Sequence, residues 1–79
     1  MNKARRKALS EIFDKLSELQ EELESIKDEE EEFRDNIPEN LQNSERYEIA
    51  DNAVSAMETA LDSIGGALDS IEEAQGEGG

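Results

Sequence analysis

Apolar residues recur along this chain at spacings that belong to helices. Every step between Leu9 and Ile26 is three or four residues, and the same spacing runs unbroken from Tyr47 to Ile71. Such steps keep side chains on one face of a helix, whereas a strand needs steps of two. The pattern therefore predicts two long amphipathic helices. The first stripe is Leu9, Ile12, Leu16, Leu19, Leu23 and Ile26, then Phe33 and Ile37 after the polar Glu30; the second is Tyr47, Ala50, Val54, Met57, Leu61, Ile64, Leu68 and Ile71.

The segment between the two stripes is predicted to be a turn. It contains the only proline of the chain, Pro38, and several asparagines, which favour a break in a helix. It has room for one short helical turn, and Asn43 or Ser44 is placed to cap the second helix. We therefore predict one all-α domain, an antiparallel two-helix hairpin similar to a coiled coil. Its predicted parts are a helix over residues 3–34, a turn over 35–43, a helix over 44–74 and a frayed tail over 75–79.

Folding the chain about its turn sets which residues face each other. Residues whose numbers sum to about 80 fall at the same height when two straight helices run antiparallel. Ile12 then lies opposite Leu68, and Leu19 opposite Leu61. We expect the two apolar stripes to face each other along the whole hairpin.

Two adjacent glycines, Gly65 and Gly66, stand between two copies of the segment ALDSI. Inside a helix each glycine costs about 1 kcal/mol relative to alanine. In the expected register Phe13 falls near them, and a notch that buries its ring would offset that cost. Two alternatives remain open: the bare backbone admits a partner, or the glycines only kink the helix.

Alanines beside the second stripe widen its apolar face to three positions in seven. A two-helix hairpin needs only two such positions, so the extra width favours a further surface that covers it. That surface is a second copy, giving a four-helix bundle, or a different protein. The simpler interpretation is that alanine only favours the helix. The candidate self-association residues are Ala53, Ala60, Ala67 and Ala74.

Charge adds a second candidate surface. The formal net charge is −14, five acids follow one another from Asp28 to Glu32, and no basic residue occurs after Tyr47. A charge run usually keeps a protein soluble. The alternative is that the carboxylates bind a basic protein, since they would repel DNA or RNA. The candidate acidic binding residues are Asp28, Glu29, Glu30, Glu31, Glu32, Glu58, Asp62, Asp69, Glu72 and Glu73.

Residues for catalysis or metal binding are sparse. Cysteine and histidine are absent, which removes disulfides, thiolate nucleophiles and the usual zinc ligands. The acidic run does not match a calcium loop, which needs glycine where this chain has Phe33. We expect no enzymatic activity, catalytic residues, cofactor or metal. No stretch is apolar enough for a membrane span or a signal peptide, so we predict a cytoplasmic protein that does not bind membranes.

The segment NIPENLQNSERYE, residues 36–48 between two acidic heptad helices, resembles a group of short acidic hairpin proteins encoded by phages and mobile elements of Gram-positive bacteria. The resemblance spans most of the chain, and its motif is structural. It implies an accessory role, such as that of anti-CRISPR and anti-restriction inhibitors that occupy nucleic-acid channels. We therefore predict a protein-binding module that mimics nucleic acid towards a basic nucleic-acid-handling protein. The alternative is a structural module that self-associates as a homodimer without such mimicry.

Overall fold

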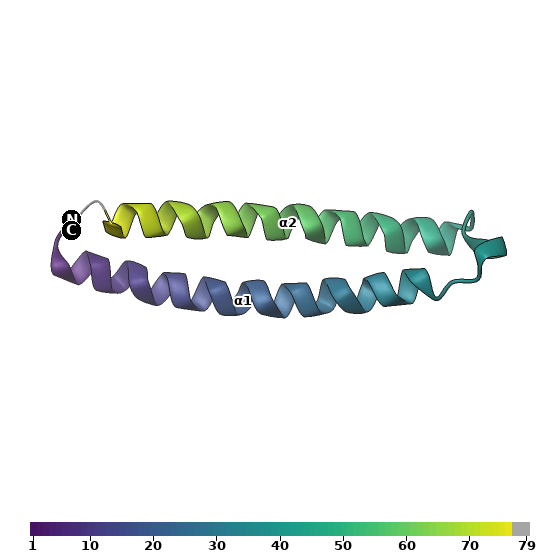
Figure 1. Ribbon diagram of the computed structural model, residues 1–79, viewed down its shortest axis with the longest axis horizontal. Coiled ribbons are helices and arrows are strands. Elements are labelled where there is room, and N and C mark those ends of the chain that lie inside the picture. Colours follow the sequence, from purple (N-terminus) through teal and green to yellow (C-terminus); the bar gives the residue numbers. More distant parts are fainter. Residues whose placement is uncertain (77–79) are drawn as a thin grey trace.

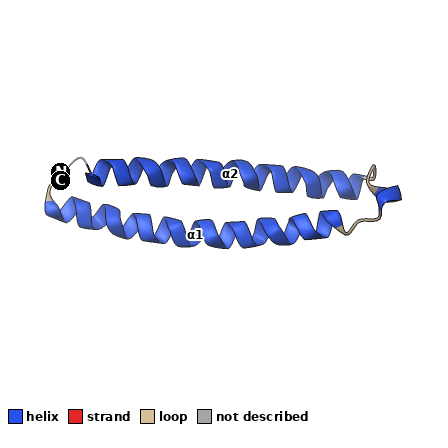
Figure 2. Ribbon diagram, in the orientation of Figure 1, coloured by secondary structure: helices blue, strands red, loops and turns tan. Residues whose placement is uncertain are grey.

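Two helices make up almost all of the computed structural model, which describes residues 1–76. Helix α1 spans Lys3–Asp35, helix α2 spans Glu45–Gly76, and a short 3-10 helix, η1, spans Glu39–Leu41 between them. The helices lie side by side and antiparallel, so that α1 begins and α2 ends at the same end of the molecule (Figure 1). The described part of the chain contains no strand (Figure 2). The predicted all-α, two-helix hairpin is confirmed.

The hairpin is a rod. Its Cα atoms extend over 59 × 15 × 13 Å, with a radius of gyration of 17.7 Å. A compact domain of this length would have a radius of gyration of about 12 Å. A rod of two helices gives each helix one neighbour, so a large part of each helix surface faces outward.

Capping residues fix where both helices begin. The Asn2 side chain accepts a hydrogen bond of 2.8 Å from the Arg5 backbone N–H. The Ser44 hydroxyl accepts one of 3.3 Å from the Tyr47 N–H, which confirms the predicted cap of the second helix. The helical turn expected in the connection is η1. At the other end α2 includes Gln75 and Gly76, which we expected in the frayed tail; residues 77–79 of that tail lie outside the described residues.

The contact between the helices, called the seam here, is apolar on α2 and mixed on α1. Among the described residues the buried hydrophobic side chains are Ile37, Ala50, Val54 and Leu68, and none of them belongs to α1. Long polar side chains on α1 cover the seam with their aliphatic parts. The seam residues of α1 are Arg6, Leu9, Phe13, Leu16, Gln20, Leu23, Lys27, Glu30 and Arg34; those of α2 are Tyr47, Ala50, Val54, Met57, Leu61, Ile64, Leu68, Ile71 and Gln75.

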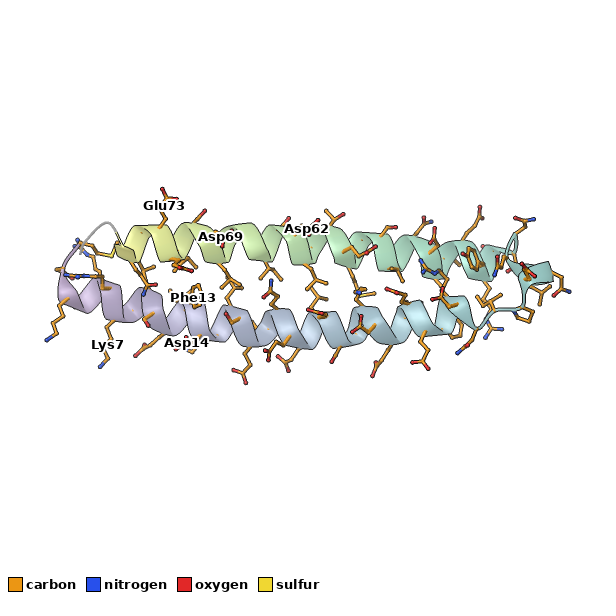
Figure 3. The ribbon with its side chains drawn as sticks, viewed as in Figure 1. Lys7, Phe13, Asp14, Asp62, Asp69 and Glu73 are labelled. Atoms are coloured by element: carbon orange, nitrogen blue, oxygen red, sulfur yellow. The ribbon has the colours of Figure 1, made fainter. Side chains whose placement is uncertain are left out.

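The expected register is wrong for every second residue of the first stripe. Ile12, Leu19, Ile26 and Phe33 are 50%, 56%, 54% and 41% exposed, so they do not face α2. Phe13, outside the predicted stripe, lies between the two helices instead (Figure 3). Helix α1 is therefore rotated about its axis, and the centre of its apolar stripe points away from the centre of the seam.

The glycines of α2 do not form a notch for Phe13. The helix continues through Gly65 and Gly66 without a positive φ. A Cβ atom added to Gly65 would lie 3.8 Å from Nε2 of Gln20, and one added to Gly66 would meet nothing within 4 Å. The notch hypothesis is wrong, because alanine fits at both positions and Phe13 approaches neither.

Candidate protein-binding surfaces

The seam divides the outer surface of the hairpin into two long sides. Residues that directly precede seam residues lie on one side of each helix, and residues that directly follow them lie on the other. Because the two helices are antiparallel, the preceding residues of both helices share one side of the hairpin. The Arg46 guanidinium lies 5.0 Å from the centroid of the Phe33 ring, which shows the sharing directly, since both residues precede seam residues.

The side of the preceding residues is called the apolar side. On α2 it carries no acid, and on α1 it carries one large hydrophobic residue every seven positions. Ile49, 61% exposed, extends it towards the turn. These rows combine half-exposed large side chains with small ones. The apolar side consists of Arg5, Ala8, Ile12, Lys15, Leu19, Glu22, Ile26, Glu29 and Phe33 on α1 and of Arg46, Ile49, Ala53, Ala56, Ala60, Ser63, Ala67, Ser70 and Ala74 on α2.

The predicted self-association residues therefore lie beside a second apolar row, whose residues the apolar spacing places in the seam and the structure does not. Ala53, Ala60 and Ala74 are partly exposed and Ala67 is exposed. Their row runs along α2, while Ile12, Leu19, Ile26 and Phe33 run along α1 on the same side of the hairpin. The signal for this row was the spacing of seven residues, which recurs in both helices.

The side of the following residues is called the acidic side. Its carboxylates on α2 are exposed, except that Asp51 is partly covered. Among residues 1–76, the carboxylates of Glu58, Asp62 and Asp69 form no ion pair. The acidic side consists of Lys7, Ser10, Asp14, Ser17, Glu21, Glu24, Asp28, Glu31 and Asp35 on α1 and of Glu48, Asp51, Ser55, Glu58, Asp62, Gly65, Asp69, Glu72 and Gly76 on α2.

The predicted acidic binding residues do not form one continuous surface. Glu58, Asp62, Asp69 and Glu72 lie together on the acidic side of α2, whereas Glu73 points outward from the back of that helix (Figure 3). The run of five acids winds around α1, because successive residues of a helix point in different directions. Asp28 and Glu31 are on the acidic side, Glu29 on the apolar side, Glu30 half-buried in the seam and Glu32 on the back.

Two cations of the seam hold carboxylates near the turn. Lys27 Nζ lies 2.8 Å from Asp28 and 3.3 Å from Glu31, and the hydrogen bond to Asp28 is the main reason why the pKa of Lys27 is raised. Arg34 Nη1 donates a 2.8 Å hydrogen bond to Asp51 of α2. The hydrogen bond from Arg34 to Asp35 is the main cause of a raised pKa for the guanidinium. Of these contacts, the one between Arg34 and Asp51 joins the two helices, and the others lie within α1.

A shallow hollow at the turn is too small for a typical ligand. Its volume is about 180 Å³, and Phe33, Ile37, Pro38, Leu41 and Arg46 are among its lining residues. Pockets that bind small molecules usually measure about 300–1,000 Å³. The hollow continues the apolar side into the turn.

Metal sites and membrane spans are not found in the part of the chain that the structure describes. No group of three or more Asp, Glu, His or Cys side chains there could hold a metal ion. Neither helix within residues 1–76 is both long and apolar enough to cross a membrane. Comparison with family models, with curated proteins and with solved structures finds no match to this chain.

Proposed function

We propose that this protein is a non-enzymatic protein-binding hairpin that packs its apolar side against helices of a partner. The observation that supports the proposal is the row of half-exposed Ile12, Leu19, Ile26 and Phe33 beside the row of alanines. A helix that meets one neighbour needs two apolar positions in seven, and a helix that meets two neighbours needs about three. Both helices carry apolar residues on the seam and on the apolar side, as helices with two neighbours do.

The small buried core supports the same proposal. Only four hydrophobic side chains of the described residues are buried, and two of them, Ile37 and Leu68, are still 8% exposed. Chains below about 80 residues rarely obtain more than about 3–5 kcal/mol from a single core and commonly gain stability from disulfides, metals or association. This chain has no cysteine or histidine for the first two. Association through the apolar side would supply the missing burial.

Site-specific photo-crosslinking tests the proposal. A photo-reactive amino acid replaces Leu19 on the apolar side in one variant and Asp62 on the acidic side in a matched variant. After illumination in cells that express the protein, we expect a covalent adduct of defined mass from the Leu19 position, whether or not the Asp62 position also reacts, with its partner identified by mass spectrometry. Adducts from Asp62 alone, or from neither position, would contradict the proposal.

A second proposal concerns the acidic side. The unpaired carboxylates of Glu58, Asp62 and Asp69 form an exposed anionic row on α2, and this favours a basic nucleic-acid-handling protein as an additional partner. On this view the hairpin is an inhibitor that occupies a nucleic-acid channel, in the cytoplasm of a host cell, and does not itself bind DNA or RNA.

Charge reversal separates the two proposals. The double variant Asp62→Lys/Asp69→Lys should lose a complex that weakens with added salt, while the adduct at Leu19 persists. Glu11→Lys/Glu18→Lys, on the outer face of α1, is the matched control because it changes the net charge by the same amount. Pull-down from the native host at low and high salt measures the complex. Equal loss in both double variants would show that net charge alone matters.

A further inference from the structure

We infer that the partner of the apolar side is a second copy of this chain, turned end for end, so that two hairpins form a four-helix bundle. The inference rests on the proposed function and names its partner and geometry. A twofold axis crosses the rod at the height of Leu19 and Ala60, which mark the middle of the two apolar rows. In this arrangement α1 packs on the partner's α1 and α2 on the partner's α2, each pair antiparallel.

The exposed area of one hairpin matches what such a dimer needs. The chain exposes 5837 Å², whereas a compact monomer of 8.8 kDa would expose about 4,800 Å². The excess, about 1,000 Å², is close to the roughly 800 Å² that each partner contributes to a standard interface. The apolar side is also of suitable size, because two helices of about 50 Å placed side by side present a face about 20 Å wide.

Three of the four large apolar residues of α1 are placed symmetrically about the axis, and the fourth, Phe33, falls level with Arg5 of the other copy. Seven residues on either side of Leu19 stand Ile12 and Ile26, so Ile12 of one copy meets Ile26 of the other and Leu19 meets its own counterpart. Ala53 and Ala67 have the same relation about Ala60 on α2. A twofold interface requires this self-complementary order of residues.

Charges on the rim of the apolar side select the end-for-end orientation. Lys15 and Glu22 lie at nearly equal distances on either side of Leu19, so each Lys15 meets Glu22 of the other copy. Farther out, the exposed Glu29 lies ten residues and the exposed Arg5 fourteen residues from Leu19, so Glu29 of one copy lies about one helical turn from Arg5 of the other. All of these contacts bring together opposite charges, which is what orients helices in antiparallel coiled assemblies.

The competing orientation places the two turns at the same end. It would stack α1 on the partner's α2, where Lys15 would lie level with Ser63 and Ala67 and Glu22 level with Ala56 and Ala60, so that neither finds an opposite charge. It would also bring the two runs Asp28–Glu32 together and the two basic starts together. Like charges that gather at one end repel, so this orientation is disfavoured.

Mass and cross-linking test the dimer and its axis. We expect sedimentation equilibrium to give twice the chain mass of 8.8 kDa at high concentration. The chain has no native cysteine, so Ala60→Cys should form an interchain disulfide on oxidation, because the axis brings the two copies within the roughly 7 Å that a disulfide spans. Asp62→Cys, on the acidic side, is the matched control and should remain monomeric on a denaturing gel. Cross-linking of Asp62→Cys but not of Ala60→Cys would overturn the inference.

A spin-label distance tests the orientation. A label on Gln42→Cys at the turn should report an intermolecular distance of about 50 Å or more, since each helix of the rod is about 50 Å long. A distance below about 25 Å would place both turns at one end and overturn the inferred orientation, since a bundle is only about two helix diameters wide.

Exchanging the charges of Lys15 and Glu22 tests their contribution to dimerisation and leaves the apolar rows unchanged. Lys15→Glu should weaken dimerisation by up to about tenfold, because two exposed pairs are lost, and Lys15→Glu/Glu22→Lys should restore it. Unchanged dimerisation in Lys15→Glu, or no recovery in the double variant, would overturn the role of these charges.

Failure of this inference is distinguishable from failure of the proposed function. A chain that sediments as a monomer at every concentration, yet gives a Leu19 adduct with a different protein, overturns the inference and leaves the proposed function standing. A monomer without any Leu19 adduct contradicts both.

Discussion

The two long sides of the hairpin are built from the same two helices. The apolar side consists of the residues that directly precede seam residues in the sequence, and the acidic side of those that directly follow them. On α2 every residue that directly follows a seam residue, from Glu48 to Glu72, is an acid, a serine or a glycine. Every residue of α2 that directly precedes a seam residue, from Ile49 to Ala74, is isoleucine, alanine or serine. A net charge of −14 therefore does not describe the surface that a partner meets. A strongly anionic rod can therefore carry one long side on which α2 has no acid.

The largest expected effect comes from placing a charge on the apolar side. Ile26→Glu should destabilise the assembled protein by about 3 kcal/mol or more, because it removes apolar burial and places a carboxylate in an interface. Denaturant unfolding followed by circular dichroism measures the loss. Ser55→Glu, on the acidic side, adds the same charge and should change stability by no more than about 0.5 kcal/mol. Equal losses of stability in Ile26→Glu and Ser55→Glu would show that the apolar side tolerates a charge as well as the acidic side does.

The glycines give a smaller effect of opposite sign. Gly65→Ala and Gly66→Ala should each stabilise the protein by about 1 kcal/mol, since a Cβ fits at both positions and alanine favours the helix. Thermal and denaturant unfolding measure the gain. Gly76→Ala, at the end of α2, is the control and should have little effect, because helix ends fray. Destabilisation by Gly65→Ala would mean that the acidic side requires bare backbone at that position.

The smallest expected effect is a pH dependence from Lys27. Its pKa is raised above the ordinary 10.5 by the hydrogen bond to Asp28, opposed by partial desolvation. A raised pKa in the folded state means that this stabilisation is complete below pH 10.5 and is lost as the pH rises through the higher folded-state value. The melting temperature of the native protein should therefore fall more steeply above that pH than that of Lys27→Gln. Parallel curves would show that the contacts with Asp28 and Glu31 contribute no net stability.

The sequence predicts the fold of this molecule better than it predicts which surface each residue occupies. Steps of three and four are enough to identify both helices, and a proline with asparagines marks the turn. Leu9, Leu16 and Leu23 fit two different seams equally well, one that includes Ile12 and one that includes Phe13. Apolar periodicity shows which face of a helix avoids water, but it does not show which neighbour covers that face.

The polar half of the α1 seam explains the remaining error. A seam that contains Gln20, Lys27 and Glu30 is not one that a search for apolar residues selects. Long polar side chains can occupy such half-buried positions because their aliphatic parts cover apolar surface while their polar ends stay at the surface, as Lys27 does with Asp28 and Glu31. Part of the predicted acidic surface is the run of consecutive acids Asp28–Glu32, and a helix distributes consecutive residues around its axis.

Helix α1 begins and α2 ends at the same end of the rod, where the Gln75 side chain donates a hydrogen bond to the Arg6 carbonyl. A fluorescent protein or an affinity tag fused ahead of α1 would thus emerge beside the basic first turn and leave the hollow at the turn unobstructed. In the end-for-end dimer that we infer, two such fusions would lie at opposite ends of the bundle, about 50 Å apart, with the bundle as a spacer between them.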